Sequence, residues 1–464
     1  MKVAIYSGSF NPPATHHQRI VRELARHFDR VLVVPSGVRP DKLSADRVAR
    51  VYRATMADLA FGGIDKADVE LFDLEQNSFT RTDELQKRFE HLGEIWHVVG
   101  SNLIEGGQRG DSVIHRVWME AQSVWREMNF AVVTRGGSRL ASADLPPHHE
   151  LIDLSLEGSS AEIRGRLFRG EPVDNLLAPD VQDYIDRHQL YRGGVPLPVT
   201  SWQIDEPRLL IVADQRNAKA REFADRLRPF ISSDRPNLIC VIGGDGTMLH
   251  AIQEHWRKRL PFFGLNAGHF GFLMNDEATV FAGAFPPSPL ILRQLPMIHA
   301  ESRLEGGEVR HDLSFNDVWV ERVTGQTAWF SLAVNGETRF SKMVSDGVLL
   351  STAAGSTAYA LSMGATPLLA DTPAWLVVGN NVMQPRGWKS AMLSLDDTVE
   401  ITVLDHDKRP VQGYLYGVPI GEVQRMRAAI SHVATAELAF CQDHDMAHKI
   451  ARLQFPPDGS QDRF

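Results

Sequence analysis

The chain has little cysteine, no surplus of positive charge and no long apolar run. Its 464 residues include only two cysteines, Cys240 and Cys441, which is too few for a disulfide framework or a cysteine-based zinc site. The net charge of −9 argues against a protein that coats nucleic acid, because no basic surplus would displace counterions from phosphates. No apolar run approaches the ~20 residues of a membrane span, and the chain opens as a strand, not a signal peptide. We therefore expect a cytoplasmic enzyme that binds neither nucleic acid nor membrane.

The pattern of apolar runs predicts an α/β protein of several domains. A chain of this length exceeds one ordinary core. In its first half, short apolar runs alternate with helical patterns, which is typical of a parallel sheet with crossover helices. A second α/β segment begins near Leu209, and short strands with turns dominate from Leu290 onward. The expected boundaries are a first domain at 1–192, a linker at 193–206, an α/β lobe at 207–288, a β-rich lobe at 289–430 and a C-terminal segment at 431–464.

The clearest motif is the glycine turn Gly243-Gly244-Asp245-Gly246-Thr247, which follows an apolar strand and precedes a helical pattern. Glycines let a backbone approach phosphate oxygens, and a helix N-terminus directs N–H groups toward them. An aspartate would repel phosphate, so Asp245 fits a group that takes a proton from an attacking hydroxyl or organises a metal. The motif predicts phosphoryl transfer. The alternative is a turn aspartate that bonds to its own backbone.

Two further motifs in the first half point to phosphate binding. The turn Ser7-Gly8-Ser9-Phe10-Asn11-Pro12-Pro13 follows the first strand, and His17 lies on the first turn of the next helix. Far along the chain, Ser159, Ser160 and Arg164 stand at another expected helix start, where hydroxyls cap or bind phosphate and a guanidinium neutralises it.

With both motifs present, residues 1–192 resemble the nicotinate or nicotinamide mononucleotide adenylyltransferases. The resemblance implies a Rossmann-like domain that transfers adenylyl from ATP to the mononucleotide, releasing pyrophosphate, with Mg²⁺ or another divalent cation as cofactor. The attacking phosphate is already an anion, so alignment and charge neutralisation suffice. The resemblance makes His17 catalytic and assigns nucleotide binding to Gly8, Ser9, Phe10, Lys42, Thr80, Trp118, Ser159, Ser160 and Arg164.

This half departs from the family pattern at two places. The usual His-x-Gly-His is Ala14-Thr15-His16-His17, so the first histidine is absent, and His16 is expected at the surface or as a support for His17. The usual glycine–aspartate pair after the third strand is Gly100-Ser101-Asn102. These departures leave a degenerate nucleotide sensor that regulates the second half as the alternative to an adenylyltransferase.

Four separated motifs make residues 207–430 resemble NAD kinases: the Gly-Gly-Asp-Gly turn, Asn266–Leu273, Phe315-Asn316-Asp317 and the stretch from Ser345 to Tyr359. The resemblance implies an α/β lobe with a mostly β lobe, and transfer of the γ-phosphate of ATP to the 2′-hydroxyl of the adenosine ribose of NAD. A hydroxyl must lose a proton as it attacks, so Asp245 would be the base. The resemblance assigns NAD and ATP binding to Gly244, Gly246, Thr247, His250, Asn316, Asp317, Asp346, Thr357, Ala358, Tyr359 and Ser362.

Some of these assignments have structural alternatives. Tyr359 also fits a packed aromatic, Asp346 a β-turn cap and His250 an ordinary helix face. A lipid kinase is disfavoured, because the chain lacks an amphipathic membrane-binding stretch. The sequence thus predicts a fused enzyme of NAD and NADP synthesis that uses ATP, a pyridine mononucleotide and NAD. The sequence does not decide whether the mononucleotide is the nicotinate or the nicotinamide form, whether the phosphoryl donor is ATP or polyphosphate, or whether the acceptor is NAD or NADH. It also leaves open the metal ligands and a possible homo-oligomer through the kinase module.

Overall fold

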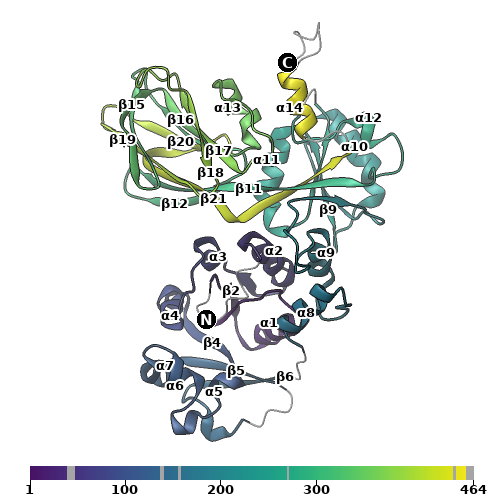
Figure 1. The fold of residues 1–464 in the computed structure, drawn as a ribbon, viewed down its shortest axis with the longest axis vertical. Coiled ribbons are helices and arrows are strands. Elements are labelled where there is room, and N and C mark those ends of the chain that lie inside the picture. Colours follow the sequence, from purple (N-terminus) through teal and green to yellow (C-terminus); the bar gives the residue numbers. More distant parts are fainter. Residues whose placement is uncertain (39–47, 136–139, 155–157, 269–270, 443–445, 456–464) are drawn as a thin grey trace. The chain divides into compact units, whose positions relative to one another are not determined.

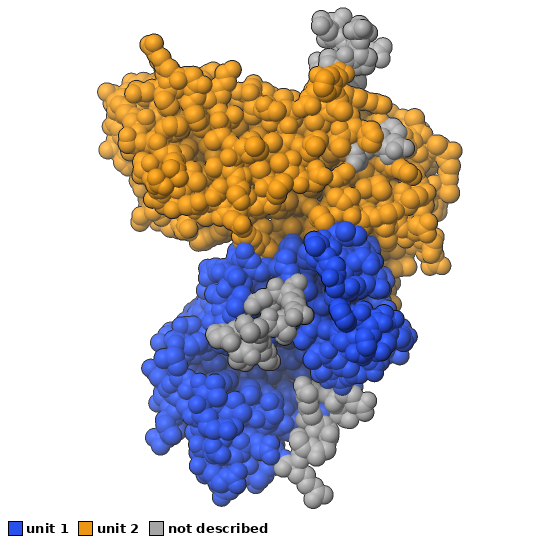
Figure 2. All heavy atoms as spheres, viewed as in Figure 1, with its two compact units in different colours: residues 1–197 blue, residues 198–464 orange. Residues whose placement is uncertain are grey.

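The protein divides into two compact units in its computed structural model, Met1–Leu197 and Pro198–Phe464 (Figures 1 and 2). The structure describes residues 1–38, 48–135, 140–154, 158–268, 271–442 and 446–455. The division falls inside the stretch 193–206 that the sequence predicts as a linker. Only its first part is a connection, because Val199–Trp202 forms strand β7, which pairs with a strand of the second unit. Among the described residues, no helix is both long and apolar enough to cross a membrane.

Unit 1 is built on a six-stranded sheet in the order β3-β2-β1-β4-β5-β6, and all neighbours are parallel. The strands are β1 (Lys2–Gly8), β2 (Arg30–Pro35), β3 (Ala67–Val69), β4 (Glu94–Gly100), β5 (Asn129–Arg135) and β6 (His149–Leu154). The helices are α1 (Thr15–His27), α2 (Arg50–Phe61), α3 (Phe72–Gln76), α4 (Thr82–Phe89), α5 (Ser101–Ile104), α6 (Val113–Val117), α7 (Ala121–Glu127), α8 (Ser160–Arg169) and α9 (Pro179–Arg187).

The strand order of unit 1 fixes where a ligand can bind. The four residues from Val31 to Val34 are all 0% exposed, as expected of a parallel strand covered on both faces. The chain leaves β1 toward β2 on one side, while β4 lies on the other side. Crossover connections therefore diverge at the carboxyl ends of β1 and β4, which opens a crevice in folds of this type. This arrangement confirms the predicted Rossmann-like first domain.

The α/β lobe of unit 2 has a mixed sheet in the order β8-β9-β10-β21-β11-β7. Its strands β8 (Leu209–Ala213), β9 (Leu238–Gly243) and β10 (Phe262–Asn266) are parallel to one another and to the last part of β21 (Val418–Cys441). Strand β11 (Leu290–Leu304) is antiparallel to β21. The helices are α10 (Ala218–Leu227), α11 (Asp245–His255), α12 (Glu277–Val280) and α14 (Met446–Gln454).

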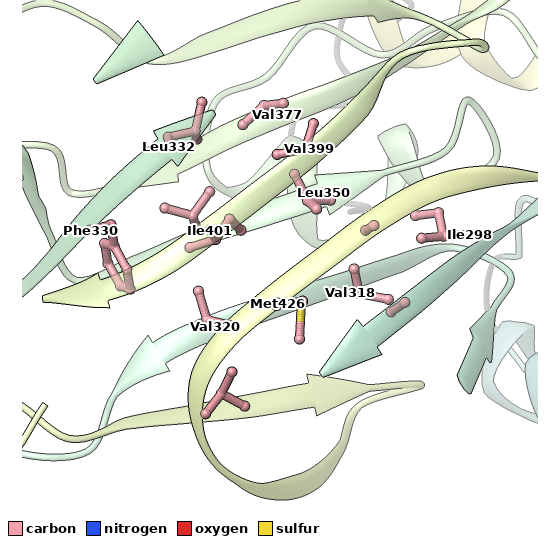
Figure 3. Close-up of a cluster of buried hydrophobic side chains, with 14 of the residues drawn as sticks. Ile298, Val318, Val320, Phe330, Leu332, Leu350, Val377, Val399, Ile401 and Met426 are labelled. Atoms are coloured by element: carbon pink, nitrogen blue, oxygen red, sulfur yellow. The ribbon is translucent and has the colours of Figure 1, made fainter. Parts of the chain in front are cut away.

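The β-rich lobe follows the strand path β15-β14-β19-β21-β20-β13-β16-β17-β18, with β12 paired to β11. Its core gathers apolar side chains from β11, β13, β14, β16, β17, β19 and β21, as Figure 3 shows. The remaining elements are β12 (Val309–Ser314), β13 (Asp317–Arg322), β14 (Ala328–Val334), β15 (Glu337–Ser345), β16 (Gly347–Ser351), α13 (Tyr359–Ser362), β17 (Ala374–Asn380), β18 (Ser390–Ser394), β19 (Thr398–Leu404) and β20 (Val411–Leu415).

Two long strands connect the lobes of unit 2, so residue 430, the predicted end of the β-rich lobe, lies inside a strand. Strand β21 has 24 residues and runs through this position without ending. Its last part, 435–441, pairs with β11 in the α/β lobe, and its middle part, 423–430, pairs with β11 near the β-rich lobe. The ladder shifts register between Pro296 and Ile298, whose partners are Thr435 and Ile430. The expected C-terminal segment 431–464 thus begins within a core strand.

Candidate active sites

Unit 1 has a cavity of about 600 Å³ at the carboxyl ends of β1 and β4. It lies where the strand order predicts a crevice. Its lining includes Asn102 and most of the residues that the sequence assigns to nucleotide binding. The predicted residues around it are Gly8, Ser9, Phe10, His17, Ser159, Ser160 and Arg164. The two motifs of the first half therefore meet at one site.

Two adjacent histidines at the start of α1 face this cavity. The backbone N–H of Ala14 donates to Nδ1 of His17 at 3.0 Å, so a neutral His17 carries its proton on Nε2. That Nε2 lies 3.2 Å from Nε2 of His16. The rings of Phe10 and His17 pack in a T-shaped arrangement with their centroids 5.2 Å apart. His16 is only 6% exposed. It therefore supports His17 and is not a surface residue.

The turn after β1 is held by side chains from distant helices. From α8, Ser160 Oγ donates to the carbonyl of Pro12 at 2.8 Å and Arg164 donates to the carbonyl of Asn11 at 2.6 Å. Ser159 is the N-cap of α8, and its hydroxyl accepts from the N–H of Glu162. These bonds fix the backbone that a phosphate would approach.

A second arginine, which sequence reasoning missed, supports the same turn. Arg53 on α2 is 3% exposed and donates to the carbonyl of Ser9 at 2.7 Å and to that of Ser36 at 2.5 Å. Tyr191 adds a hydrogen bond of 2.5 Å to the side chain of Asn11. No local motif marks Arg53, because it acts only through tertiary contacts.

Two predicted residues of this half, Thr80 and Trp118, lie elsewhere. Thr80 belongs to a loop held by the buried Asp73, whose carboxylate accepts from Thr80 Oγ1 at 2.5 Å. Trp118 packs against the hydrophobic cluster around Phe130. Neither is among the described residues that line the cavity. Lys42 lies outside the described residues.

In unit 2, Asp245 is the first residue of α11, directly after the N-cap Gly244. Strand β9 before it is buried throughout, which places the glycine turn at the carboxyl edge of the sheet. The Asp245 carboxylate accepts two backbone N–H groups at 2.9 Å each, from Phe272 to Oδ2 and from Leu273 to Oδ1. These donors are 27 and 28 residues away, so its bonds extend well beyond its own turn.

The pKa of Asp245 is raised above its ordinary value, chiefly by burial, although the two N–H groups and the charge of Lys449 lower it in part. Such a pKa brings a carboxyl closer to the range of a useful base. Around it, Gly243 is required for close packing, because a Cβ there would lie 2.3 Å from Thr247 Oγ1. Gly246 and His250 are exposed on the same helix.

The two motifs of the β-rich lobe also come together. The carbonyl of Asn316 accepts from the N–H of Thr352 at 2.8 Å, and a Cβ on Gly355 would lie 2.2 Å from that carbonyl. Phe315 and Ala354 share a hydrophobic cluster with Met248 of α11 and Leu273. The Asn316 and Asp245 motifs are thus joined through one core.

The Asn316-Asp317 pair has the properties of a ligand-binding group. Asn316 is 8% exposed, and among the described residues its Oδ1 has no hydrogen-bond partner. Asp317 is 7% exposed, and burial raises its pKa to about 7. Native proteins rarely leave such groups without partners unless the site has a function.

An aromatic cluster stands beside this pair. The Tyr359 ring meets Trp319 edge-on at 5.3 Å, and Trp319 stacks on Tyr414 at 4.8 Å. Tyr359 is therefore a packed aromatic, and it is half-exposed, so the two interpretations offered by the sequence are compatible. Thr357 is buried, with its hydroxyl donating to the carbonyl of Ala354, while Ala358 and Ser362 lie at the start and end of α13.

Asp346 is the exception among the predicted residues. It precedes β16, at the opposite end of the β13–β16 pair from Asp317, whose partner is Ser351. Five strand residues separate the two ends, or about 17 Å at 3.3 Å per residue. Its carboxylate accepts from Arg322 at 2.6 Å and from Asn381 at 2.8 Å. Within this chain, Asp346 is not brought together with the other binding residues.

A smaller cavity of about 240 Å³ lies where β11 shifts register, with Pro296 and Ile430 in its lining. Its lining contains none of the individual residues that the sequence assigns to NAD binding, but it includes Thr352, whose N–H donates to the carbonyl of Asn316. Among the residues that the structure describes, no three His, Cys, Asp or Glu side chains are grouped to hold a metal ion.

Both units have the features of enzymes that act on nucleotide phosphates. Residues 207–284 match the family described as ATP-NAD kinase N-terminal domain, and residues 5–166 match the cytidylyltransferase-like family. The NAD kinase of Rickettsia prowazekii (strain Madrid E) is 30% identical over 254 residues, covering 54% of this chain and 98% of that protein. The chain belongs to the NAD kinase family.

Other relatives carry the same name. The NAD kinase of Xanthomonas oryzae pv. oryzae (strain MAFF 311018) is 33% identical over 226 residues, covering 48% of this chain and 86% of that protein. Among solved structures, the yeast NADH kinase complexed with NADH aligns with a TM-score of 0.48 and 16% identity, covering 56% of this chain and 92% of that chain.

Proposed function

We propose that unit 1 transfers adenylyl from ATP to nicotinate or nicotinamide mononucleotide, so that the chain both makes a dinucleotide and phosphorylates NAD. The cavity between β1 and β4 carries this proposal, because it gathers His17, Arg164 and the turn after β1 at one switch point. Membership of the NAD kinase family covers the second reaction. The product class of unit 1 is then the substrate class of unit 2.

In unit 1, a phosphate oxygen of the mononucleotide forms a bond to the α-phosphorus of ATP, while the bond to the β-phosphate breaks and pyrophosphate leaves. No proton has to be removed from the nucleophile, so the site needs only to align the phosphates and neutralise charge. His17 suits this task, since its Nδ1 is held by the backbone N–H of Ala14 and its ring lines the cavity together with that of His16. Gly8, at the end of β1, lets the Phe10 ring pack closely against the turn, because a Cβ at this position would lie 3.1 Å from that ring.

In unit 2, the 2′-hydroxyl of the adenosine ribose attacks the γ-phosphorus of ATP, ADP leaves, and the hydroxyl proton passes to Asp245. Two N–H bonds hold the carboxylate in place. Asn316 Oδ1 can accept a hydrogen bond from a ribose hydroxyl. The aromatic cluster of Trp319, Tyr359 and Tyr414 can stack against a planar base.

We propose that Mg²⁺ enters both sites bound to ATP. Mg²⁺ commonly keeps several waters and is bound by phosphate oxygens with only one or two carboxylates. It therefore does not require a cluster of three protein ligands, and the described residues form none. When bound, it would neutralise charge on the leaving phosphates. The chain's own contribution is to position the phosphates with His17, Arg164 and the N-terminus of α11.

The test uses the intact chain with ATP, Mg²⁺ and each mononucleotide in turn, followed by pyrophosphate measurement and separation of the products. We expect pyrophosphate with at least one mononucleotide, and NADP when the nicotinamide form is supplied. His17→Ala should stop pyrophosphate release but still convert added NAD to NADP, whereas Asp245→Asn should do the reverse. If neither mononucleotide yields pyrophosphate while NAD is phosphorylated, unit 1 is a nucleotide sensor and the proposal is wrong.

A further inference from the structure

A buried lysine on the C-terminal helix contacts the turn that binds Asp245. Lys449 is 5% exposed and lies on α14, after the last strand. Its ammonium donates to the carbonyl of Gly271 at 2.8 Å, to that of Phe272 at 3.4 Å and to that of Met274. Three carbonyls thus replace the water that a lysine would otherwise bind.

The same turn supplies both hydrogen bonds to Asp245. The carbonyl of Gly271 and the N–H of Phe272 belong to one peptide group, and the carbonyl of Phe272 and the N–H of Leu273 belong to the next. Each peptide group accepts from Lys449 at its oxygen and donates to Asp245 at its nitrogen. Hydrogen bonds in such a chain polarise and strengthen one another.

We propose that Lys449 is a positioning residue for NAD phosphorylation, which fixes these two peptide groups so that their N–H groups hold the Asp245 carboxylate toward the ribose hydroxyl. The inference rests on the proposed role of Asp245 as the base. It assigns a function to the C-terminal helix, about 200 residues further along the chain than the motif it supports.

Docking of α14 does not explain a lysine at this position. Met446 and Ile450, which are 0% and 1% exposed, already anchor the helix, and Met446 joins the same core as Met248 and Leu273. Burial of an ammonium has a large desolvation cost, and here it is offset by the three carbonyls of the turn.

The space around the turn is tight enough to transmit the contact. A Cβ on Gly271 would lie 2.9 Å from Asp245 Oδ1 and 2.8 Å from Met274 Cγ. Among the described residues, Cys441, at the end of β21, interacts with the charges of both Lys449 and Asp276; burial keeps the thiol neutral by raising its pKa to about 12. The charge that acts on Asp245 is that of Lys449, and it lowers the pKa of the carboxyl.

The experiment compares Lys449→Met and Lys449→Arg with Arg452→Met in the full chain. Arg452 is exposed on the same helix, so its variant removes an equal charge without touching the turn. For Lys449→Met we expect kcat for NADP formation to fall about 10- to 100-fold, as for a misplaced reacting group, while KM for NAD and pyrophosphate release by unit 1 stay unchanged. Lys449→Arg should recover most of the loss, and Arg452→Met should match the wild type.

The pH profile distinguishes positioning from mere docking. Removal of the Lys449 charge raises the pKa of Asp245, so the acidic limb of kcat should move to higher pH and the loss should be larger at low pH. A wild-type kcat in Lys449→Met, or a loss with an unmoved limb and no recovery by arginine, overturns the inference. If Asp245→Asn keeps full kinase activity, the proposed base itself is wrong, which is a separate outcome.

Discussion

The burial of Asp317 leads to a stability prediction with an unusual sign. This carboxyl is 7% exposed, and burial raises its pKa from 3.8 to about 7. A raised pKa means that the folded state favours the protonated acid, so ionisation above pH 7 acts against folding. Moving a carboxyl pKa by this amount corresponds to about 4 kcal/mol. Asp317→Asn keeps the shape without the charge, and it should stabilise unit 2 at alkaline pH.

The pH window follows from the two pKa values. Below about pH 4 the carboxyl is protonated in both the folded and the unfolded state, so Asp317→Asn has the same free energy of unfolding as the wild type. Above about pH 7 the variant gains the full stabilisation. At pH 5 less than half of the gain is present. The gain at pH 8.5 should exceed that at pH 5 by about 2–3 kcal/mol, or roughly 4–10 °C in Tm for a unit of this size.

Differential scanning calorimetry of the intact chain at both pH values provides the measurement. The relevant transition is the one that NAD raises in the wild type. Asp407→Asn, at an aspartate whose side chain is 87% exposed, is the matched control and should move that transition little at either pH. A gain for Asp317→Asn that is equal at both pH values, or larger at pH 5, would refute the argument. The same variant should phosphorylate NAD more slowly if Asp317 contacts NAD, as the resemblance to NAD kinases implies.

Three further variants test individual contacts. Asn316→Ala should raise KM for NAD about 2- to 12-fold, the worth of one hydrogen bond, in steady-state assays; an unchanged KM would exclude Oδ1 as a ligand. His16→Ala should slow pyrophosphate release less than His17→Ala and leave NADP formation from added NAD intact, whereas equal losses would make His16 a direct phosphate ligand. Gly355→Ala should lower the Tm of unit 2, since its Cβ would lie 2.2 Å from the Asn316 carbonyl; Gly325→Ala, with open space around it, is the control.

Local sequence patterns were sufficient to predict the parallel sheet of unit 1 and the glycine turn at Asp245. Both depend on a buried strand that leads directly into a helix, and such patterns are contained within a few residues. The meeting of the two phosphate motifs in unit 1 followed from the parallel topology, since strands of one direction bring their carboxyl ends to one edge.

The remainder depended on contacts between distant residues. Nothing near position 430 indicates that β21 continues, because its partners on β11 are more than a hundred residues away. Asp346 and Ser351 belong to the same sequence motif, yet the five-residue strand β16 separates them, so they lie at opposite ends of that strand. Lys449 had one signal, its place on the same helical face as Met446 and Ile450, where a charged residue is out of pattern.

The register shift in the β11–β21 ladder decides where unit 2 can bend. On each side of the shift, β11 and β21 form a regular ladder of paired residues. Such a ladder resists rotation of one strand against the other. At the shift itself, Ser431 Oγ accepts hydrogen bonds from the N–H groups of Val433 and Ala434. A side chain therefore takes the place of a strand partner for these residues, beside the 240 Å³ cavity. Any closing of the nucleotide lobes on each other is therefore expected to pivot at residues 431–434, with the flanking strands moving as rigid arms.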